Sequence, residues 1–584
     1  MLFLNEGYRF MSRPRLAYCL VLAVFSSTSV ADAQLSKLQQ NDFSSATMNF
    51  ANITSTNLVQ TDNETVDHEK EVAVGDIDQD GDLDVVVISA RSFTQPRRNA
   101  LYLNNGGVLE ENSQLVSANG TDWRFFTNLA RNALLKDFDA DGWLDLIVIS
   151  DSLGGIATGT TRYYRNQHPG GVFTGFVEDT SRLGGSNGAA CGGVSGDFDH
   201  DGDEDYWFGN YPGPSQDTME FNNGTGNFNR ASSNMVPSDT AYTVDVATGD
   251  INGDGKTDMF VSNEGEASLI YYNDLNDAGS QVGDFRYPGS TEVIHPGNNL
   301  YPAMEPGDFN GDGRLDIYFA NFGTGANAGK DSILVNNGND ASGKATFVEF
   351  VMPDFVSDNE TAKVTVSDLN GDGRVDLLVM GGSQHFSSQR RRPVIYRNTS
   401  VNGQTSFVEW TPAPAFPSGT AQSGWFASAF DADGDQRKEI FVGGMRNDFL
   451  IKSVPTRVWQ GPRPGGVLPA VHNQEPLAVI GTLTMGEQLD FTSSIPAGAT
   501  VSAVLNSTAG VTLEILNGGS LVASSNRGGL GVEEAVEFEA PGGTLTFRVI
   551  LDESTAAAPR NPLGLPYTAH QGDRYQLEVL SRSN

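Results

Sequence analysis

The 584-residue chain is poor in cysteine and in basic residues. It has two cysteines, and 37 lysines plus arginines stand against 73 aspartates plus glutamates, for a formal net charge of −36. The first cysteine, Cys19, lies in an N-terminal segment that we expect to be removed, so Cys191 is left without an intramolecular disulfide partner. The shortage of basic residues argues against nucleic-acid binding, because phosphate contacts need a basic surface.

Apolar runs long enough for a membrane span are also missing. The run from Leu16 to Phe25 is shorter than the ~20 residues that a spanning helix needs. It follows two arginines and precedes the small-residue site Ala31-Asp32-Ala33, a pattern that predicts a secretory signal peptide over residues 1–33, cut after Ala33. We therefore expect a secreted protein, extracellular or periplasmic, without a transmembrane anchor.

Known catalytic motifs are absent too. The sequence has no nucleophile elbow, no His-Glu-x-x-His motif and no phosphate-binding loop, and its seven histidines are scattered. Catalytic residues are therefore unknown, and the sequence leaves open whether the protein is an enzyme.

What the chain has in abundance is aspartate and glycine in one repeated pattern. The stretch "DIDQDGDLD" from Asp76 returns in six further copies, the last one degraded, at intervals of 53 to 63 residues. The copies begin at Asp76, Asp137, Asp197, Asp250, Asp308, Asp368 and Asp431. Aspartates crowded this closely repel one another unless water or a cation screens them.

Strand patterns surround each copy of the loop. A strand precedes it, an apolar strand such as Val85 to Ile88 follows it, a third strand ends in Asn, and a fourth begins at a Phe. Four short strands in each of seven repeats predict an all-β fold, a seven-bladed β-propeller. In the last repeat we expect Thr456 to Gly461 as the third strand and an N-terminal strand near Phe50 as the fourth, which would close the ring.

The loop has the chemistry of a calcium site. Positions 1, 3 and 5 are Asp or Asn, position 6 is Gly in six copies, and position 9 is Asp or Glu. Hard oxygen ligands at alternate positions suit Ca²⁺ better than Mg²⁺, and zinc is excluded by the lack of His and Cys ligands. An EF-hand is excluded because position 12 is apolar in every copy. The remaining alternative is a set of solvated acidic turns.

On these residues the repeats resemble the FG-GAP and VCBS repeats of integrin α-subunits and of secreted bacterial proteins, over residues 35–468. The resemblance implies a seven-bladed propeller with Ca²⁺ bound in up to seven hairpin loops on one face. The ligands that it implies are Asp76, Asp78, Asp80 and Asp84; Asp137, Asp139, Asp141 and Asp145; Asp197, Asp199, Asp201 and Asp205; Asp250, Asn252, Asp254 and Asp258; Asp308, Asn310, Asp312 and Asp316; Asp368, Asn370, Asp372 and Asp376; and Asp431, Asp433, Asp435 and Glu439.

The chain changes texture after about Glu475. Short strands with alternating apolar residues, such as Val511, Leu513 and Ile515, predict a small β-sandwich over residues 475–584. This part resembles the pre-peptidase C-terminal domain, which implies an accessory or export-linked module. The stretch Gly461 to Gly466 reads as the linker.

A basic patch is expected on the face opposite the calcium loops. It lies in the loops that join the second strand of a blade to its third strand, in the neighbouring sixth, seventh and first blades. It comprises Arg91, Arg97, Arg98, Arg390, Arg391, Arg392, Arg446 and Lys452. Such a patch would bind an anionic ligand such as an acidic polysaccharide. The alternative is a set of solvated loops that balance local charge.

Three functions fit these patterns. The first is a monomeric calcium-stabilised module that binds an extracellular carbohydrate or protein in adhesion. The second is a propeller-based polysaccharide lyase or other carbohydrate-active enzyme. The third is a passive spacer. Fold analogy carries much of this choice.

Overall fold

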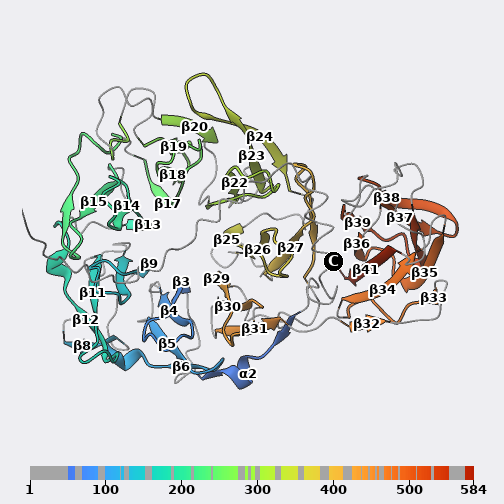
Figure 1. Cartoon of the computed structure of the whole chain (residues 1–584), viewed down its shortest axis with the longest axis horizontal. Helices are drawn as coiled ribbons and strands as arrows, with labels where there is room; N and C mark the ends of the chain where they lie inside the picture. Colours follow the sequence, from blue (N-terminus) through green and yellow to red (C-terminus); the bar gives the residue numbers. More distant parts are fainter. Residues whose placement is uncertain are drawn as a thin grey trace, which may run out of the picture.

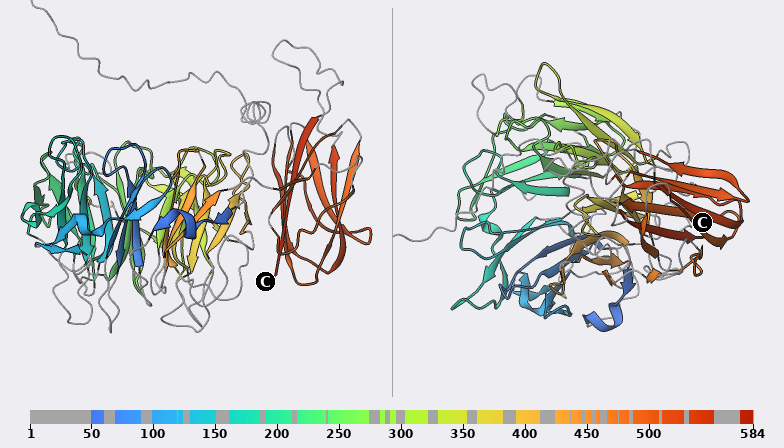
Figure 2. Two further views of the ribbon diagram at one scale, coloured as in Figure 1. Left: turned by 90° about the horizontal axis from the view of Figure 1, so that it is seen from below. Right: turned by 45° about the vertical axis from the view of Figure 1, so that its right-hand side comes forward.

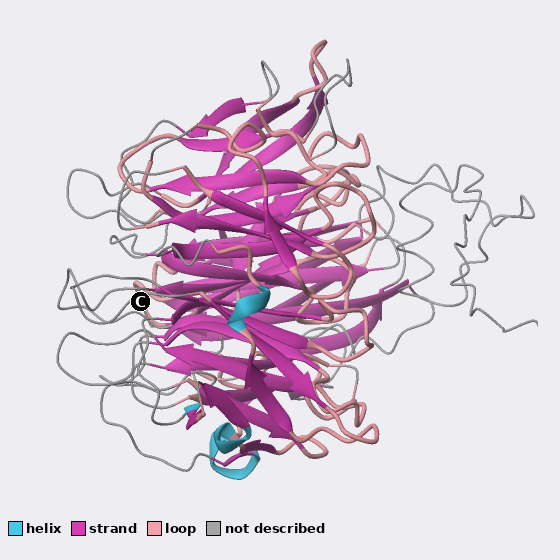
Figure 3. Ribbon diagram, turned by 90° about the vertical axis from the view of Figure 1, so that its left-hand side faces the viewer, coloured by secondary structure: helices cyan, strands magenta, loops and turns pink. Residues whose placement is uncertain are grey.

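The computed structural model is built almost entirely of strands (Figures 1 and 3). It describes residues 50–59, 69–89, 99–118, 120–123, 130–150, 161–185, 190–211, 216–238, 241–273, 283–286, 291–295, 303–321, 330–352, 361–381, 393–411, 424–435, 437–444, 448–453, 457–459, 466–474, 476–483, 487–507, 510–527, 532–551 and 573–583. The predicted signal peptide lies outside the described residues. Within them, no helix is both long and apolar enough to cross a membrane.

The described part of residues 50–453 contains seven sheets, each built on four antiparallel strands. In chain order these are β3 (Glu69–Gly75), β4 (Asp84–Ser89), β5 (Ala100–Asn104) and β6 (Leu109–Glu111); β9 (Ala130–Lys136), β10 (Asp145–Ser150), β11 (Arg162–Gln167) and β12 (Gly175–Glu178); β13 (Ala190–Gly196), β14 (Asp205–Asn210), β15 (Thr218–Asn222) and β16 (Phe228–Arg230); β17 (Thr243–Gly249), β18 (Asp258–Asn263), β19 (Ser268–Tyr271) and β20 (Thr291–His295); β21 (Met304–Gly307), β22 (Asp316–Phe319), β23 (Ser332–Asn339) and β24 (Ala345–Val351); β25 (Thr361–Ser367), β26 (Asp376–Gly381), β27 (Val394–Asn398) and β28 (Phe407–Glu409); and β29 (Gly424–Phe430), β30 (Glu439–Gly444), β31 (Phe449–Ser453) and β1 (Phe50–Asn52).

Short elements extend two of these sheets. After β1 the chain forms α2 (Thr54–Asn57) and then β2 (Leu58–Val59), which pairs in parallel with β6 of the first sheet. The second sheet gains β7 (Val116–Ala118) and β8 (Thr121–Asp122) beside β12. The 3-10 turns η2 (Ser113–Leu115) and η5 (Thr180–Arg182) complete the repeat region.

The last sheet of the repeats combines both ends of the region. Phe50 pairs with Ser453 and Asn52 with Ile451 in an antiparallel register, so the predicted fourth strand near Phe50 is confirmed. The predicted third strand, Thr456 to Gly461, is wrong. The third strand is β31, and β32 (Arg457–Trp459) instead pairs with a strand of the C-terminal region.

Each hydrophobic cluster of the repeat region lies between adjacent sheets. On β4, Val86 and Ile88 pack toward the second sheet, whereas Val85 and Val87 pack toward the seventh. Since side chains alternate faces along a strand, a strand covered on both faces must be apolar throughout. This arrangement explains the wholly apolar run that follows the acidic loop in each repeat.

The first strands of the sheets lie toward the middle of the array (Figure 1). Each contacts the next in chain order, from β3 through β9, β13, β17, β21 and β25 to β29, and β29 contacts β3.

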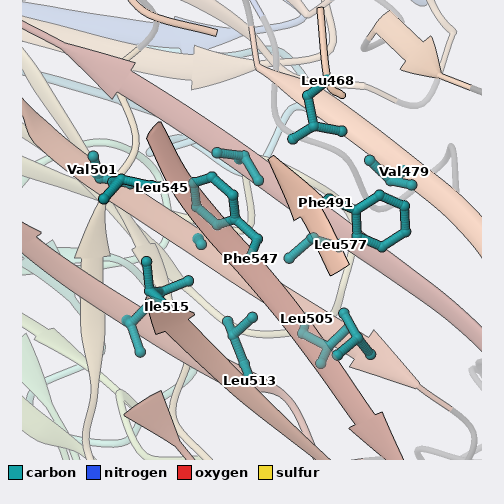
Figure 4. Close-up of a cluster of buried hydrophobic side chains, with 14 of the residues drawn as sticks. Leu468, Val479, Phe491, Val501, Leu505, Leu513, Ile515, Leu545, Phe547 and Leu577 are labelled. Atoms are coloured by element: carbon teal, nitrogen blue, oxygen red, sulfur yellow. The ribbon is translucent and has the colours of Figure 1, made fainter. Parts of the chain in front are cut away.

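The C-terminal region is a pair of five-stranded sheets that enclose one apolar core, as predicted for a β-sandwich (Figures 2 and 4). One sheet runs in the order β32, β34 (Leu477–Leu483), β41 (Asp573–Arg582), β36 (Thr500–Ser507) and β39 (Glu534–Glu539). The other runs β33 (Gly466–Val467), β35 (Gln488–Ile495), β40 (Gly543–Leu551), β37 (Val511–Asn517) and β38 (Ser520–Ser525). Phe491, Phe547 and Leu577 lie in this core.

The sandwich is docked on the sixth sheet through buried charges and apolar contacts. The fully buried Arg397 guanidinium donates to Glu578 at 2.8 Å and to Glu533 at 3.2 Å. Beside it, Trp410 packs in one cluster with Val504, Ala535 and Leu580 of the sandwich. The two regions therefore share a dry, charge-paired interface.

Candidate metal centres

The acidic loops connect the first and second strands of the sheets, and their backbone is left-handed at two positions. At position 6, the glycines Gly81, Gly142, Gly202, Gly255, Gly313 and Gly373 have φ between 85° and 99°. Position 4 is also left-handed. In the first three loops it is Gln79, Ala140 or His200, with φ between 56° and 58°, and in the other four loops it is a glycine. Left-handed backbone is costly for residues with a Cβ, so the chain accepts some strain in the first three loops to give this turn.

Three carboxylates converge in four of the loops. Each group offers oxygens that lie within 4.8 Å of one another, close enough to hold a metal ion. The groups are Asp76, Asp78 and Asp84; Asp137, Asp139 and Asp141; Asp197, Asp199 and Asp205; and Asp431, Asp433 and Glu439. Thus the first, second, third and seventh loops bring together three of their four predicted ligands.

Several of these oxygens are buried without a hydrogen-bond partner. They are Asp76 Oδ1, Asp139 Oδ1, Asp197 Oδ1, Asp199 Oδ1 and Glu439 Oε1. A buried carboxylate oxygen without a donor is costly, and a hard cation bound by the loop would supply the missing partner. The donor set of the loops therefore fits Ca²⁺, which favours six to eight oxygen ligands.

The position 9 carboxylate is the deepest member of each loop, at most 1% exposed. In the first loop, Asp84 accepts the Ile77 N–H on one oxygen and the Asn104 N–H on the other, both at 2.8 Å. Burial raises the pKa of Asp84 to about 7 and that of Asp258 to about 8. A cation at the loop would favour the ionised form.

The second loop differs at position 9. The Tyr163 hydroxyl donates to Asp145 Oδ2, and Asp145 is not among the converging carboxylates. Its position 5 aspartate, Asp141, lies 2.8 Å from Nε2 of His168, whose ring stacks on Trp143 at 4.6 Å.

The fourth, fifth and sixth loops have Asn in place of Asp at position 3. The amides of Asn252, Asn310 and Asn370 donate to the position 5 aspartates at 3.0–3.2 Å. In the fifth and sixth loops an arginine at position 7, Arg314 or Arg374, also contacts that aspartate. The four predicted ligands of each of these loops lie in the same turn, but each loop carries one carboxylate fewer than a loop with Asp at position 3.

The seventh loop already holds a cationic side chain. The Lys452 ammonium on β31 contacts Asp433 Oδ2 and lies 3.1 Å from Asp435 Oδ2. Lys452 was predicted to belong to the basic patch on the opposite face, and this prediction is wrong. β31 is the third strand, and Lys452 lies near its end, beside the loop.

The arginines of that predicted patch, Arg91, Arg97, Arg98, Arg390, Arg391, Arg392 and Arg446, lie outside the described residues. Trp123 is fully buried and packs against Tyr164.

An Asn at or near the end of the third strand has a role that the loop motif did not indicate. In six sheets its side-chain amide donates to the position 2 carbonyl of the acidic loop in the neighbouring repeat, at 2.7–3.1 Å. The residues are Asn104, Asn166, Asn222, Asn273, Asn336 and Asn398. Asn104 reaches Ala432 of the last repeat. The Asn that recurs in the sequence could have predicted this contact. The six amides connect six of the acidic loops to the sheet of a neighbouring repeat.

A second charged cluster lies on the first strands. Lys363 contacts Asp245 at 2.9 Å and Glu305 at 3.1 Å. Glu71 lies beside them and accepts from Asn132 at 3.4 Å, and burial raises its pKa to about 8. No motif predicted this cluster, because its members come from different repeats.

Comparisons with known proteins agree with the repeats. The FG-GAP-like repeat family matches residues 137–208, 197–261, 250–319 and 308–379. No curated protein matches the sequence.

Solved structures match at low identity. BBS1N in complex with ARL6DN is 9% identical with a TM-score of 0.39, covering 70% of this chain and 97% of its own. The Vibrio cholerae biofilm matrix protein Bap1 is 12% identical with a TM-score of 0.30, covering 92% and 71%. The pre-peptidase C-terminal domain of a Bacillus anthracis collagenase is 15% identical with a TM-score of 0.14, covering 20% and 98%. Likenesses this weak carry no argument about function.

The family match spans five consecutive acidic loops, which begin at Asp137, Asp197, Asp250, Asp308 and Asp368, and the same loop recurs before and after the matched residues. The chain therefore contains FG-GAP-like repeats over residues 137–379.

Proposed function

We propose that the chain is an exported, calcium-stabilised β-propeller of seven blades that serves as a binding module for an extracellular carbohydrate or protein. The observation that carries the proposal is the set of buried, partnerless carboxylate oxygens at position 1, position 3 or both in each of the first three loops. Acidic turns open to solvent would leave no such oxygens buried.

Two contacts between the first and last sheets support a closed ring. β29 packs against β3, and the side chain of Asn104 donates to the Ala432 carbonyl at 2.7 Å. The pairing of β1 with β31 covers an edge that would otherwise be free to pair with another chain. β32 and β33 pair with strands of the sandwich. We therefore place the boundary between the two domains at residues 454–456, earlier in the chain than the predicted linker Gly461 to Gly466.

Calcium would act as a staple in a chain without disulfides. Extracellular calcium modules bind with Kd of ~10⁻⁴–10⁻³ M. At ~1–10 mM calcium, a site with a Kd of ~0.1 mM adds roughly 1.4–2.7 kcal/mol to the free energy of unfolding. Several such sites together would rival the whole stability of a domain.

The experiment is thermal unfolding of the mature chain with Ca²⁺, with Mg²⁺ and after chelation, with bound metal counted in parallel. We expect a melting temperature that rises by more than ~10 °C with Ca²⁺ alone, together with several ions per chain. No bound metal and no shift would overturn the proposal.

A matched pair of variants locates the effect. Asp199→Ala removes a partnerless buried oxygen in the third loop, whereas Asp203→Ala changes a half-buried carboxylate at position 7 of the same loop. We expect the first to lower the number of bound ions by one and the second to leave it unchanged.

The binding role is tested with polygalacturonate and a neutral glucan. Replacement of Arg390, Arg391 and Arg392 by alanine is expected to abolish retention on the anionic polymer and not to affect the neutral one. Unsaturated product released from polygalacturonate by the parent chain would instead support the lyase alternative.

A further inference from the structure

The seventh loop departs from the others in the residue that faces its carboxylates. The pairings Val85 with Tyr102 and Ile440 with Ile451 make Lys452 the equivalent of Leu103 in the first sheet. The same register position is occupied by Phe221, Tyr272 and Val335 in the third, fourth and fifth sheets. In the sixth sheet it is Arg397, which turns to Glu533 and Glu578 of the sandwich.

Arg165 holds this position in the second sheet and acts electrostatically on Asp139 of its own loop. Among the described residues, however, only Lys452 forms ion pairs with the carboxylates of its own loop from this position. Its ammonium contacts the carboxylates at positions 3 and 5, Asp433 and Asp435. These are two of the oxygens that a calcium ion would need. An ammonium group and Ca²⁺ cannot share them, because like charges a few ångströms apart repel strongly in a partly buried site.

We infer that the Lys452 side chain takes the place of the metal ion in the seventh loop, so that this repeat is held together without calcium. The inference rests on the proposed function for the other loops. Lys452 lies on the third strand, outside the acidic loop motif.

The position of this loop gives the replacement a structural meaning. The seventh loop lies against the turn of the first sheet, where a Cβ on Gly107 would come within 2.7 Å of Asp433 Cβ. Asn104 donates to Ala432 beside it. Lys452 pairs with Asp433 at any calcium concentration. It therefore keeps in position the loop that contacts the first repeat.

One feature of the loop is left unchanged by Lys452. Glu439 accepts the Ala432 N–H at 2.9 Å on one oxygen, and its other oxygen is buried without a partner. The loop thus retains carboxylates that can bind a metal ion once the ammonium is removed.

The test compares the number of calcium ions bound by the mature chain and by Lys452→Met after equilibrium dialysis. We expect the variant to bind one ion more than the parent. Lys438→Met, which removes the same charge from position 8 of the same loop, is the control and is expected to bind the parental number. An unchanged number in Lys452→Met would overturn the inference.

A second pair of variants keeps the test decisive if Lys452→Met does not fold. Asp433→Asn combined with Asp435→Asn is expected to leave the number of bound ions unchanged, whereas Asp78→Asn combined with Asp80→Asn is expected to lower it by one. Loss of one ion in both variants would overturn the inference and leave the proposed function standing. No calcium in the parent chain would contradict the proposed function itself.

Discussion

The repeat region and the C-terminal sandwich are both all-β, but they are held together differently. The repeats divide their apolar residues among separate clusters between neighbouring sheets, and acidic loops and amide ties connect one repeat to the next. The sandwich encloses a single cluster, and its described residues contain no group of carboxylates that could hold a metal ion. Small cores in series therefore need polar contacts between repeats in addition to apolar burial, whereas the sandwich relies mainly on one larger core.

The largest effect is expected in the sandwich core. Phe547 is fully buried there, and Phe547→Ala should cost about 3–5 kcal/mol of unfolding free energy because it leaves a cavity. The loss should be the same with calcium and after chelation, as measured by denaturant unfolding. Leu521→Ala, at a position 57% exposed, is the control. A calcium-dependent loss would break the contrast between the regions.

A comparable effect is expected where the regions meet. Arg397→Met leaves Glu578 buried without its guanidinium partner and Glu533 paired with Arg374 alone, and breaking a buried pair costs about 3–5 kcal/mol. Calorimetry should then resolve the two regions as separate transitions. Arg548→Met, which removes a partly exposed partner of Asp490, should cost at most about 1 kcal/mol. Transitions that stay merged in Arg397→Met would show that the remaining contacts, which include the Arg374–Glu533 and Arg582–Glu409 ion pairs, are sufficient to couple the regions.

A smaller effect is expected from the ties between repeats. The amide of Asn336 donates to the Ile251 carbonyl of the preceding loop and to Leu315 of its own. Asn336→Ala should destabilise the repeats by about 1–3 kcal/mol, because buried carbonyls lose their donor. The exposed Asn227 serves as the control position in the same chemical denaturation assay. Equal losses in the two alanine variants would mean that the tie contributes nothing beyond an ordinary turn.

The smallest effect concerns pH and the cluster on the first strands. Because the pKa of Glu71 is about 8 in the folded chain and about 4.3 in an unfolded one, the folded state binds this proton more tightly. Its contribution to stability is greatest at low pH and declines as pH rises from about 4.3 to about 8. Glu71→Gln should therefore raise the melting temperature relative to the parent at pH 8 and have little effect at pH 5.

The charged groups that face Glu71 are Lys363, Asp245 and Glu305, with Asn132 beside them. Lys363 keeps Asp245 and Glu305 as partners in Glu71→Gln. A difference between variant and parent that is constant from pH 5 to pH 8 would contradict the assignment of this titration to Glu71.

Much of the repeat region could be predicted because its information is local. The apolar run Val85 to Ile88 and the left-handed Gly81 reflect strand and turn preferences that act within a few residues. The last repeat was harder. Thr456 to Gly461 has the composition of a strand, but its partner in the sandwich could not be known from composition.

The sequence by itself determined the repeat, the all-β class and the acidic loop, since each depends on spacing and residue type within one short segment. Tertiary structure alone decided which side chains meet across repeats. It brought Asn104 to Ala432, Lys452 to Asp433, and Arg397 to Glu578, pairs that are separated by 19 to 328 residues. Contacts of this kind depend on where the sheets lie relative to one another, and no local preference specifies that.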